Sequence, residues 1–226
     1  MLTALPTEAV LMTYGLGANL TDLLQKGLEL FFEVYFQTGT VQETDVAKIK
    51  AGGIALEFGL KYAFDMNMHP WIELKITTLS GDSDQSATDD EVDAFVGYGY
   101  NDDLMIMFSQ FYGLYWYTNF LGILLSGGAD FSLGGGTDNL HLKFVLGILK
   151  ANEDVRNSFV PTETTDKLGN EFDVILTYDY SKQVQLILSI GLLFGSEVME
   201  FLSGGSADSD SSDSSMIFSF GLHGKF

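Results

Sequence analysis

Hydrophobic and polar residues alternate one by one along most of this chain. From Leu28 to Phe36, leucine, valine and phenylalanine occupy every second position, and Glu29 and Glu33 occupy two of the positions between them. A period of two residues is typical of β-strands that have one apolar and one polar face. The same period recurs in further segments, which are 54–64, 71–79, 140–149, 172–180, 184–194 and 216–225.

Two more segments, at 10–20 and about 119–133, follow the pattern less regularly, so the sequence predicts about nine strands. They are long, at roughly 10–14 residues, whereas strands of globular proteins average about 5–6 and membrane-spanning strands need about 9–11. Their polar faces carry Gly59, Gly147, Gly191 and Gly221, which weaken a water-exposed strand but leave room inside a crowded barrel. The pattern therefore favours an all-β fold, a transmembrane antiparallel up-and-down β-barrel with about 8–10 strands from this chain. A soluble β-sandwich or lipid-binding barrel stays open as an alternative.

The links between the predicted strands alternate in length, as they do in outer-membrane barrels, whose short turns lie on the periplasmic side. We expect one barrel domain over residues 1–226, with long polar loops at about 80–117, 151–169 and 197–215. Part of the first loop, 93–117, is rich in aromatic residues and methionine. It has two interpretations, which are an inward-folded constriction or plug, and a strand extension with aromatic residues at the membrane interface.

Composition excludes several functions. The 226 residues carry a formal charge of −20, with 31 acidic and 11 basic residues, no cysteine and 3 histidines. An acidic chain with one arginine does not suit nucleic-acid binding, and the lack of cysteine excludes disulfides and thiolate metal sites. The mean hydropathy is +0.16, yet no apolar run approaches the roughly 18–20 residues of a membrane helix. We expect no cofactor and no metal site.

One stretch, Leu168–Gly195 (LGNEFDVILTYDYSKQVQLILSIGLLFG), reads as a hairpin and resembles the closing hairpins of the alginate-export-type porins. These porins are outer-membrane β-barrels of Gram-negative bacteria. Residues 51–80, in which Pro70 and Trp71 open a strand after a short turn, are similar to an earlier hairpin of that family. Residues 80–93 are similar to the acidic loop that follows it.

Residues 112–130 and the terminal Phe226 also fit the family, so the likeness covers most of the chain and is to the C-terminal half of these porins. Gly195-Ser196 replaces a Pro-Gly step and Gly224 stands where a hydrophobic residue is usual, which is consistent with a shortened or engineered barrel. The resemblance implies a bacterial outer-membrane location, with Phe226 as the membrane-insertion signal. It also implies the lipid bilayer, lipopolysaccharide and the barrel-assembly machinery as partners, and it leaves the oligomeric state open. The first residues show no signal-peptide pattern, so we expect this sequence to start after the signal peptide.

The alternation also predicts which polar side chains point into the barrel. Seven carboxylates and four lysines among them predict a mildly cation-preferring lumen, because rings of Asp and Glu attract cations. The other interpretation is that Glu–Lys pairs fill a narrow interior and satisfy each other. A conduit for polyanionic alginate would need basic residues, so the cargo of the family does not carry over. The predicted lumen-lining residues are Glu29, Glu33, Glu57, Lys61, Glu73, Lys75, Asp130, His141, Lys143, Asp173, Asp179 and Lys225.

No catalytic motif is present in the sequence. It lacks a G-x-S-x-G element, and His69, His141 and His223 lie far apart. The Asp-rich segments 82–93 and 208–213 do not follow the EF-hand calcium pattern, so we expect solvated loops there. We therefore expect no enzyme but an outer-membrane porin-like channel for the passive diffusion of small solutes and ions. The alternative is a plugged structural or engineered transmembrane β-barrel without transport activity.

Overall fold

The computed structural model describes residues 10–43, 48–83, 91–97, 103–108, 116–133, 139–157, 159–203 and 214–224. In these residues one antiparallel sheet holds nine long strands, each 9–18 residues in length. The two-residue strand β5 (Glu91–Val92) pairs in parallel with β3, and the helix α1 (Glu197–Ser203) follows β9. The long strands are β1 (Val10–Thr21), β2 (Leu28–Glu43), β3 (Lys48–Ala63), β4 (Trp71–Leu79), β6 (Phe120–Ser132), β7 (Asn139–Arg156), β8 (Thr164–Asp179), β9 (Val184–Phe194) and β10 (Ser214–Gly224).

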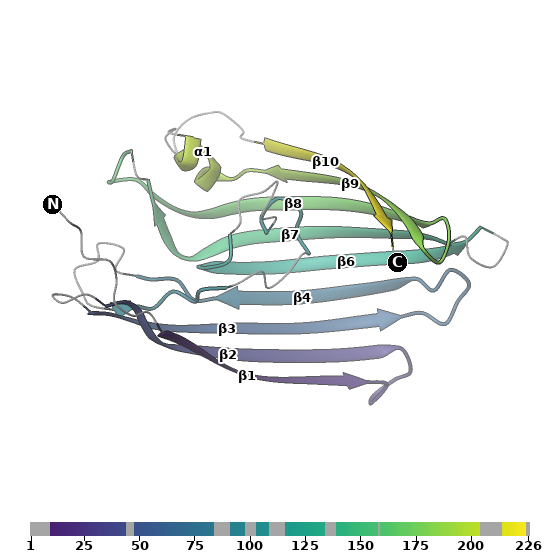
Figure 1. Cartoon of the computed structure of the whole chain (residues 1–226), viewed down its shortest axis with the longest axis horizontal. Coiled ribbons are helices and arrows are strands. Elements are labelled where there is room, and N and C mark those ends of the chain that lie inside the picture. The colour runs from purple at the N-terminus through teal and green to yellow at the C-terminus, as the bar shows by residue number, and fades with distance from the viewer. Residues whose placement is uncertain are drawn as a thin grey trace.

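Each long strand pairs with the long strand that follows it in the chain, from β1 to β10 (Figure 1). The all-β antiparallel prediction is confirmed, and the two less regular segments of the sequence form β1 and β6. Within the described residues β1 pairs only with β2, and β10 pairs only with β9, so the sheet has two free edges. Closure into a barrel therefore stays a prediction. No helix of the described residues is long and apolar enough to cross a membrane.

The antiparallel order sorts the connections between two ends of the sheet. The tight turns at 22–27, 64–70 and 180–183 lie at one end, here called the turn end (right in Figure 1). The end of β4, the start of β6 and the helix α1 lie at the opposite end, here called the loop end.

The loop predicted at 151–169 is too long. β7 runs on to Arg156 and β8 begins at Thr164, because the two strands keep pairing through Val155 and Thr165 after the apolar part of their pattern has ended. The loop predicted at 197–215 begins with α1 and ends where β10 starts, at Ser214.

The two faces of the sheet are the reverse of those of a water-soluble protein. The apolar positions point outward and stay uncovered, with exposed fractions of 49% for Phe58, 54% for Ile148 and 65% for Phe218. The opposite, polar face contains Lys75 and Asp173, which are buried. We call these the outer face and the inner face. A sandwich would pack two sheets through their apolar faces, whereas the described strands form a single sheet with its apolar face bare.

A second layer of chain covers the inner face toward the loop end. It consists of residues 93–97, 103–108 and 116–119 together with α1, and we call it the inner layer. Its apolar side chains Leu104, Ile106, Met107 and Val198 are buried in one cluster with inner-face residues of six strands, from β3 to β9. The described part of 93–117 is therefore folded inward, as the constriction or plug interpretation predicts. Tyr117 is buried in the cluster and Trp116 packs against it. These two aromatic residues therefore do not lie on the outer face, where the second interpretation would place them at a membrane interface.

Inner-face glycines make room for this layer. A Cβ atom at Gly191 would lie 3.1 Å from Met105 Cβ, and one at Gly147 would lie 3.2 Å from Leu104 Cδ2. At Gly128 the same space is filled by the indole ring of Trp71, 2.9 Å from the position of the added atom. Such cross-strand pairs of glycine and an aromatic residue stabilise strongly bent sheets. Close packing thus explains Gly128, Gly147 and Gly191, whereas an added Cβ at Gly221 on β10 would make only ordinary van der Waals contacts.

The β1–β2 turn depends on Gly27. Its φ of +84° is in the region that favours glycine, and an added Cβ would collide with the carbonyl oxygen of Ala63. We expect Gly27→Ala to lower the free energy of unfolding by about 1–3 kcal/mol, measured by urea titration of the purified protein. Gly221→Ala is the matched control, because the nearest atom is Ile187 Cβ at 3.7 Å, and it should stay within about 0.5 kcal/mol of wild type. Equal effects of the two substitutions would contradict this role of Gly27.

Candidate functional site

The inner face contains the predicted lumen-lining residues that the structure describes. Register shows this directly, because residues opposite each other on paired strands share a face. Glu29 is opposite Lys61, and Lys61 is opposite Glu73. Asp130 is opposite His141 in the same way. Eleven of the twelve residues lie on this face, which are Glu29, Glu33, Glu57, Lys61, Glu73, Lys75, Asp130, His141, Lys143, Asp173 and Asp179. Lys225 and Phe226 lie outside the described residues.

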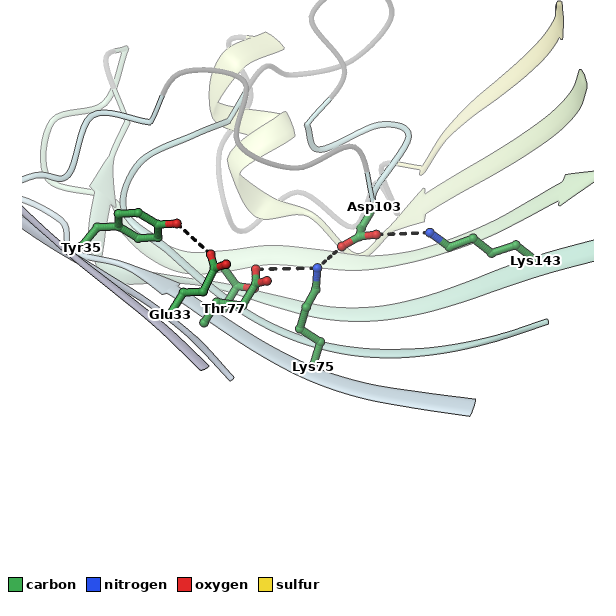
Figure 2. Close-up of polar contacts among 7 residues, drawn as sticks. Glu33, Tyr35, Lys75, Thr77, Asp103 and Lys143 are labelled. Carbon is green, nitrogen blue, oxygen red and sulfur yellow. Dashed lines mark hydrogen bonds and ion pairs between the residues drawn. The ribbon is translucent and has the colours of Figure 1, made fainter. Parts of the chain in front are cut away.

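The first group within this set is an ion-pair chain in the middle of the inner face. Figure 2 shows Asp103 of the inner layer reaching down between Lys75 of β4 and Lys143 of β7. Asp103 Oδ1 is 3.2 Å from Lys143 Nζ, and its other oxygen contacts Lys75. Lys75 Nζ is also 3.7 Å from Glu57, which accepts a hydrogen bond of 3.0 Å from the hydroxyl of Thr77. The sheet and the inner layer are therefore joined by charge.

The burial of these charged side chains determines how costly it is to break the ion pairs. The side chain of Lys75 is only 7% exposed and that of Asp103 is 19% exposed. Burial alone would raise the pKa of the Asp103 carboxyl, but Lys75 and Lys143 outweigh it and lower that pKa below the ordinary value of 3.8. Asp103 therefore stays ionised. An ion pair this deeply buried is costly to break, because the charge that remains is left without its partner.

A second group clamps the backbone of the inner layer. Glu171 of β8 accepts hydrogen bonds from the backbone N–H groups of Ile106 (2.5 Å) and Met107 (2.9 Å). Asp173, two residues along the same strand, accepts one from the N–H of Met105 (3.0 Å). Both carboxylates are fully buried. The two side chains thus supply oxygen acceptors to three consecutive backbone N–H groups, so this clamp fixes the depth of residues 105–107.

A third group lies nearer the turn end, where the inner face is more open. The ring of His141 is between two carboxylates, with Nδ1 2.6 Å from Asp130 and Nε2 2.9 Å from Asp179. A ring that donates to both carries a proton on each nitrogen. Gln185 donates to the second oxygen of Asp179 at 2.8 Å. The side chains of Asp130 and His141 are 47% and 39% exposed, so this group is open to solvent.

Sequence reasoning missed Asp103 and Glu171. Glu171 could have been found, because it continues the inner face of β8 one step beyond Asp173. Asp103 could not, because the alternation ends outside the strands and nothing local shows that the segment folds back onto Lys75 and Lys143. Within the described residues no group of three His, Cys, Asp or Glu side chains is arranged to hold a metal ion.

The arrangement divides the inner face into two parts. Toward the loop end it is filled by the inner layer, and toward the turn end it presents charged and aromatic side chains, including Lys61 with its Nζ 4.8 Å from the centre of the Trp71 ring. The turn-end part of the inner face is thus polar and partly open to solvent, and the described contacts reveal no catalytic arrangement there. A scan of protein-family models and a search of curated proteins found no match for this chain.

Asp103→Asn should loosen the inner layer, because it removes both ion pairs and leaves the buried Lys75 without its closest carboxylate. We expect hydrogen exchange at the amides of residues 105–107 to become about 10- to 100-fold faster. Asp65→Asn is the matched control, because it breaks the pair with Lys26 at the turn end, where both side chains are more than 80% exposed. Unchanged exchange in the Asp103→Asn variant would show that the ion pairs do not hold the layer.

Proposed function

We propose that the sheet is part of the wall of a transmembrane β-barrel in the bacterial outer membrane. In this proposal it forms a porin-like channel for the passive diffusion of small solutes and ions, with a mild preference for cations. The observation that carries the proposal is the bare apolar outer face. Monomeric soluble proteins rarely expose a continuous apolar surface that extends across a whole sheet, and lipid is the environment in which such a face is stable.

The height of the apolar surface is similar to that of outer-membrane barrels, which supports the proposed membrane location. On β9 the outer apolar positions run from Val184 to Phe194. These 11 residues of strand are about 36 Å long, and at a tilt of about 40° they form a belt about 28 Å high, close to the roughly 25 Å of outer-membrane barrels.

Charged residues on the outer face lie where this belt ends. Lys150 follows Ile148 on the outer face of β7, and Lys50 precedes Ile54 on that of β3. Both are exposed and paired at 2.9 Å with acidic partners, Asp166 and Glu91. The loop end of the sheet therefore has the polar rim that a membrane interface requires.

The charge of the inner face supports the cation preference. Of the predicted residues that are described, seven are carboxylates, three are lysines and one is His141, and Glu171 and Asp103 add two more carboxylates. Nine carboxylates against four basic groups leave an excess of negative charge. Such an excess attracts cations to a pore.

The plugged barrel without transport is the second candidate, and the inner layer favours it. Met107, Val198 and Phe108 are buried against the sheet and fill the loop-end half of the inner face. Some outer-membrane barrels are closed by loops or a helix in the same way. The two candidates share the membrane location and differ in whether solutes pass the inner layer.

The membrane location can be tested on neighbouring residues of one strand, because the chain has no cysteine. Leu60 faces outward and Lys61 faces inward on β3. We expect a spin label on Leu60→Cys in lipid vesicles to be reached mainly by oxygen, which concentrates in lipid, and one on Lys61→Cys mainly by a water-soluble nickel complex. The reverse result, or a folded monomer that needs no detergent, would contradict the membrane location.

Single-channel recording in planar bilayers tests transport. We expect wild type to conduct, and the Glu29→Gln, Glu33→Gln, Glu57→Gln triple variant to lose most of its preference for potassium over chloride, because three carboxylates leave the lumen. Asp65→Asn is the control, since it removes an exposed charge at the turn end and should leave selectivity unchanged.

A Glu171→Gln, Asp173→Asn variant separates the two candidates, because it weakens the clamp on the inner layer. A current in wild type supports the channel. If neither protein conducts, or only the clamp variant does, the native protein is the plugged barrel.

A further inference from the structure

The two free edges of the sheet lack the features that protect edge strands in soluble proteins. Such edges usually carry lysine, proline, an inward-pointing charge or a bulge, which prevent pairing with another chain. β1 reads VLMTYGLGANLT and β10 reads SSMIFSFGLHG. Neither strand contains Asp, Glu, Lys, Arg or Pro, and neither has a bulge in its register. Both edges are therefore competent to pair.

In a bilayer these edges have to pair. Every backbone N–H and C=O in the hydrocarbon region needs an internal partner, since no water is present there. The outer side chains of the edge strands are also the barest of the sheet, with Leu16 and Met216 both 71% exposed. The edges match each other, since β1 has 12 residues and β10 has 11, with apolar outer positions and small or polar inner ones such as Gly17 and Ser219.

Strand direction limits how the edges can meet. Nine strands in an antiparallel series leave β1 and β10 running the same way, from the loop end to the turn end. Any direct contact between a β10 edge and a β1 edge that keeps both loop ends on one side of the membrane is therefore a parallel pair.

Width argues against pairing within one chain. A barrel of nine strands, spaced by about 4.8 Å and tilted by about 40°, is about 18 Å across between backbones. A layer of chain packs about 10 Å from a sheet, measured between backbones, so an inner layer with wall on both sides needs about 20 Å. The buried cluster that contains the inner layer already includes residues of six strands of this sheet, and Ile217 of β10 packs against that cluster as well. Closing one chain on itself would have to expel this layer.

We propose that two copies of this chain close one barrel together, with β10 of each copy pairing in parallel with β1 of the other. The proposal rests on the membrane location proposed above. A twofold axis along the barrel keeps both loop ends on the same side and makes the two seams identical, so the assembly closes without leaving an edge. Each copy contributes half of the lumen, which is incomplete in the single chain.

Cross-linking in detergent or lipid tests this with single-cysteine variants of the cysteine-free chain. Leu16→Cys on β1 is refolded together with Met216→Cys, Phe218→Cys or Phe220→Cys on β10, and a short bis-maleimide is added. These positions all lie on the outer face, and the series allows for the unknown register of the seam. We expect at least one mixture to give a covalent dimer several-fold more efficiently than either variant alone, because β1 meets β10 and not a second β1.

Two controls calibrate the reaction. In a Leu60→Cys, Leu74→Cys variant the two cysteines lie directly opposite each other on β3 and β4. The bis-maleimide should therefore link them within one chain. Leu16→Cys mixed with Leu146→Cys, which lies in the middle of the sheet on β7, should not link. Native mass in detergent should correspond to twice the 24.8 kDa of one chain.

A link between β1 and β10 that forms only within one chain, in a Leu16→Cys, Phe218→Cys double variant, would overturn the two-copy barrel and leave the membrane location intact. Absence of any seam link while the β3–β4 control reacts would overturn it as well. Failure of the membrane location is recognised separately, by the spin labels on Leu60→Cys and Lys61→Cys.

Discussion

The fold depends on an apolar face that the described chain leaves without cover. In a soluble protein this face would drive folding by packing against another layer. Here the packing occurs on the opposite, polar face, where buried carboxylates and lysines replace a purely apolar core. The sheet itself is held by its backbone ladder, and its outer side chains contribute stability only in a medium that prefers them to water. In the membrane location proposed above, lipid would stabilise this face, whereas in water the same exposed apolar residues would make the chain associate.

On the inner face, several buried acidic side chains contact groups of other elements. Asp103 joins two strands that are separated by β6, and Glu171 binds backbone groups that have no ladder partner in the sheet. These contacts order a segment that has no regular secondary structure of its own. Gly147 and Gly191 complete the fit, because any side chain there would push the segment away from its carboxylates. Charge, backbone hydrogen bonding and small residues thus act at the same place.

Period-two alternation was sufficient to predict the strands, their faces and the side on which eleven polar residues lie, because a strand exposes alternate residues to opposite sides whatever its partners. It was insufficient for the loop at 151–169, since pairing of Val155 with Thr165 needs no apolar pattern. It also could not place Asp103, whose partners are 28 and 40 residues away in the chain. Contacts of this kind depend on the curvature of the whole sheet, which no local pattern encodes.

How the two sheet edges pair and whether the lumen conducts are linked, because both depend on the number of strands in the wall. A channel that conducts past an inner layer needs a wall wider than nine strands provide, whereas a plugged barrel could be narrow. The inner layer in this structure covers the face toward the loop end and leaves the group around His141 open to solvent. A narrow barrel would be filled by its own side chains and would not need a layer that covers only one end of its inner face. It fits the wider, two-copy barrel proposed above, in which a segment folded against one wall would narrow the passage without closing it. Whether solutes can pass the inner layer therefore depends on the number of strands that complete the wall.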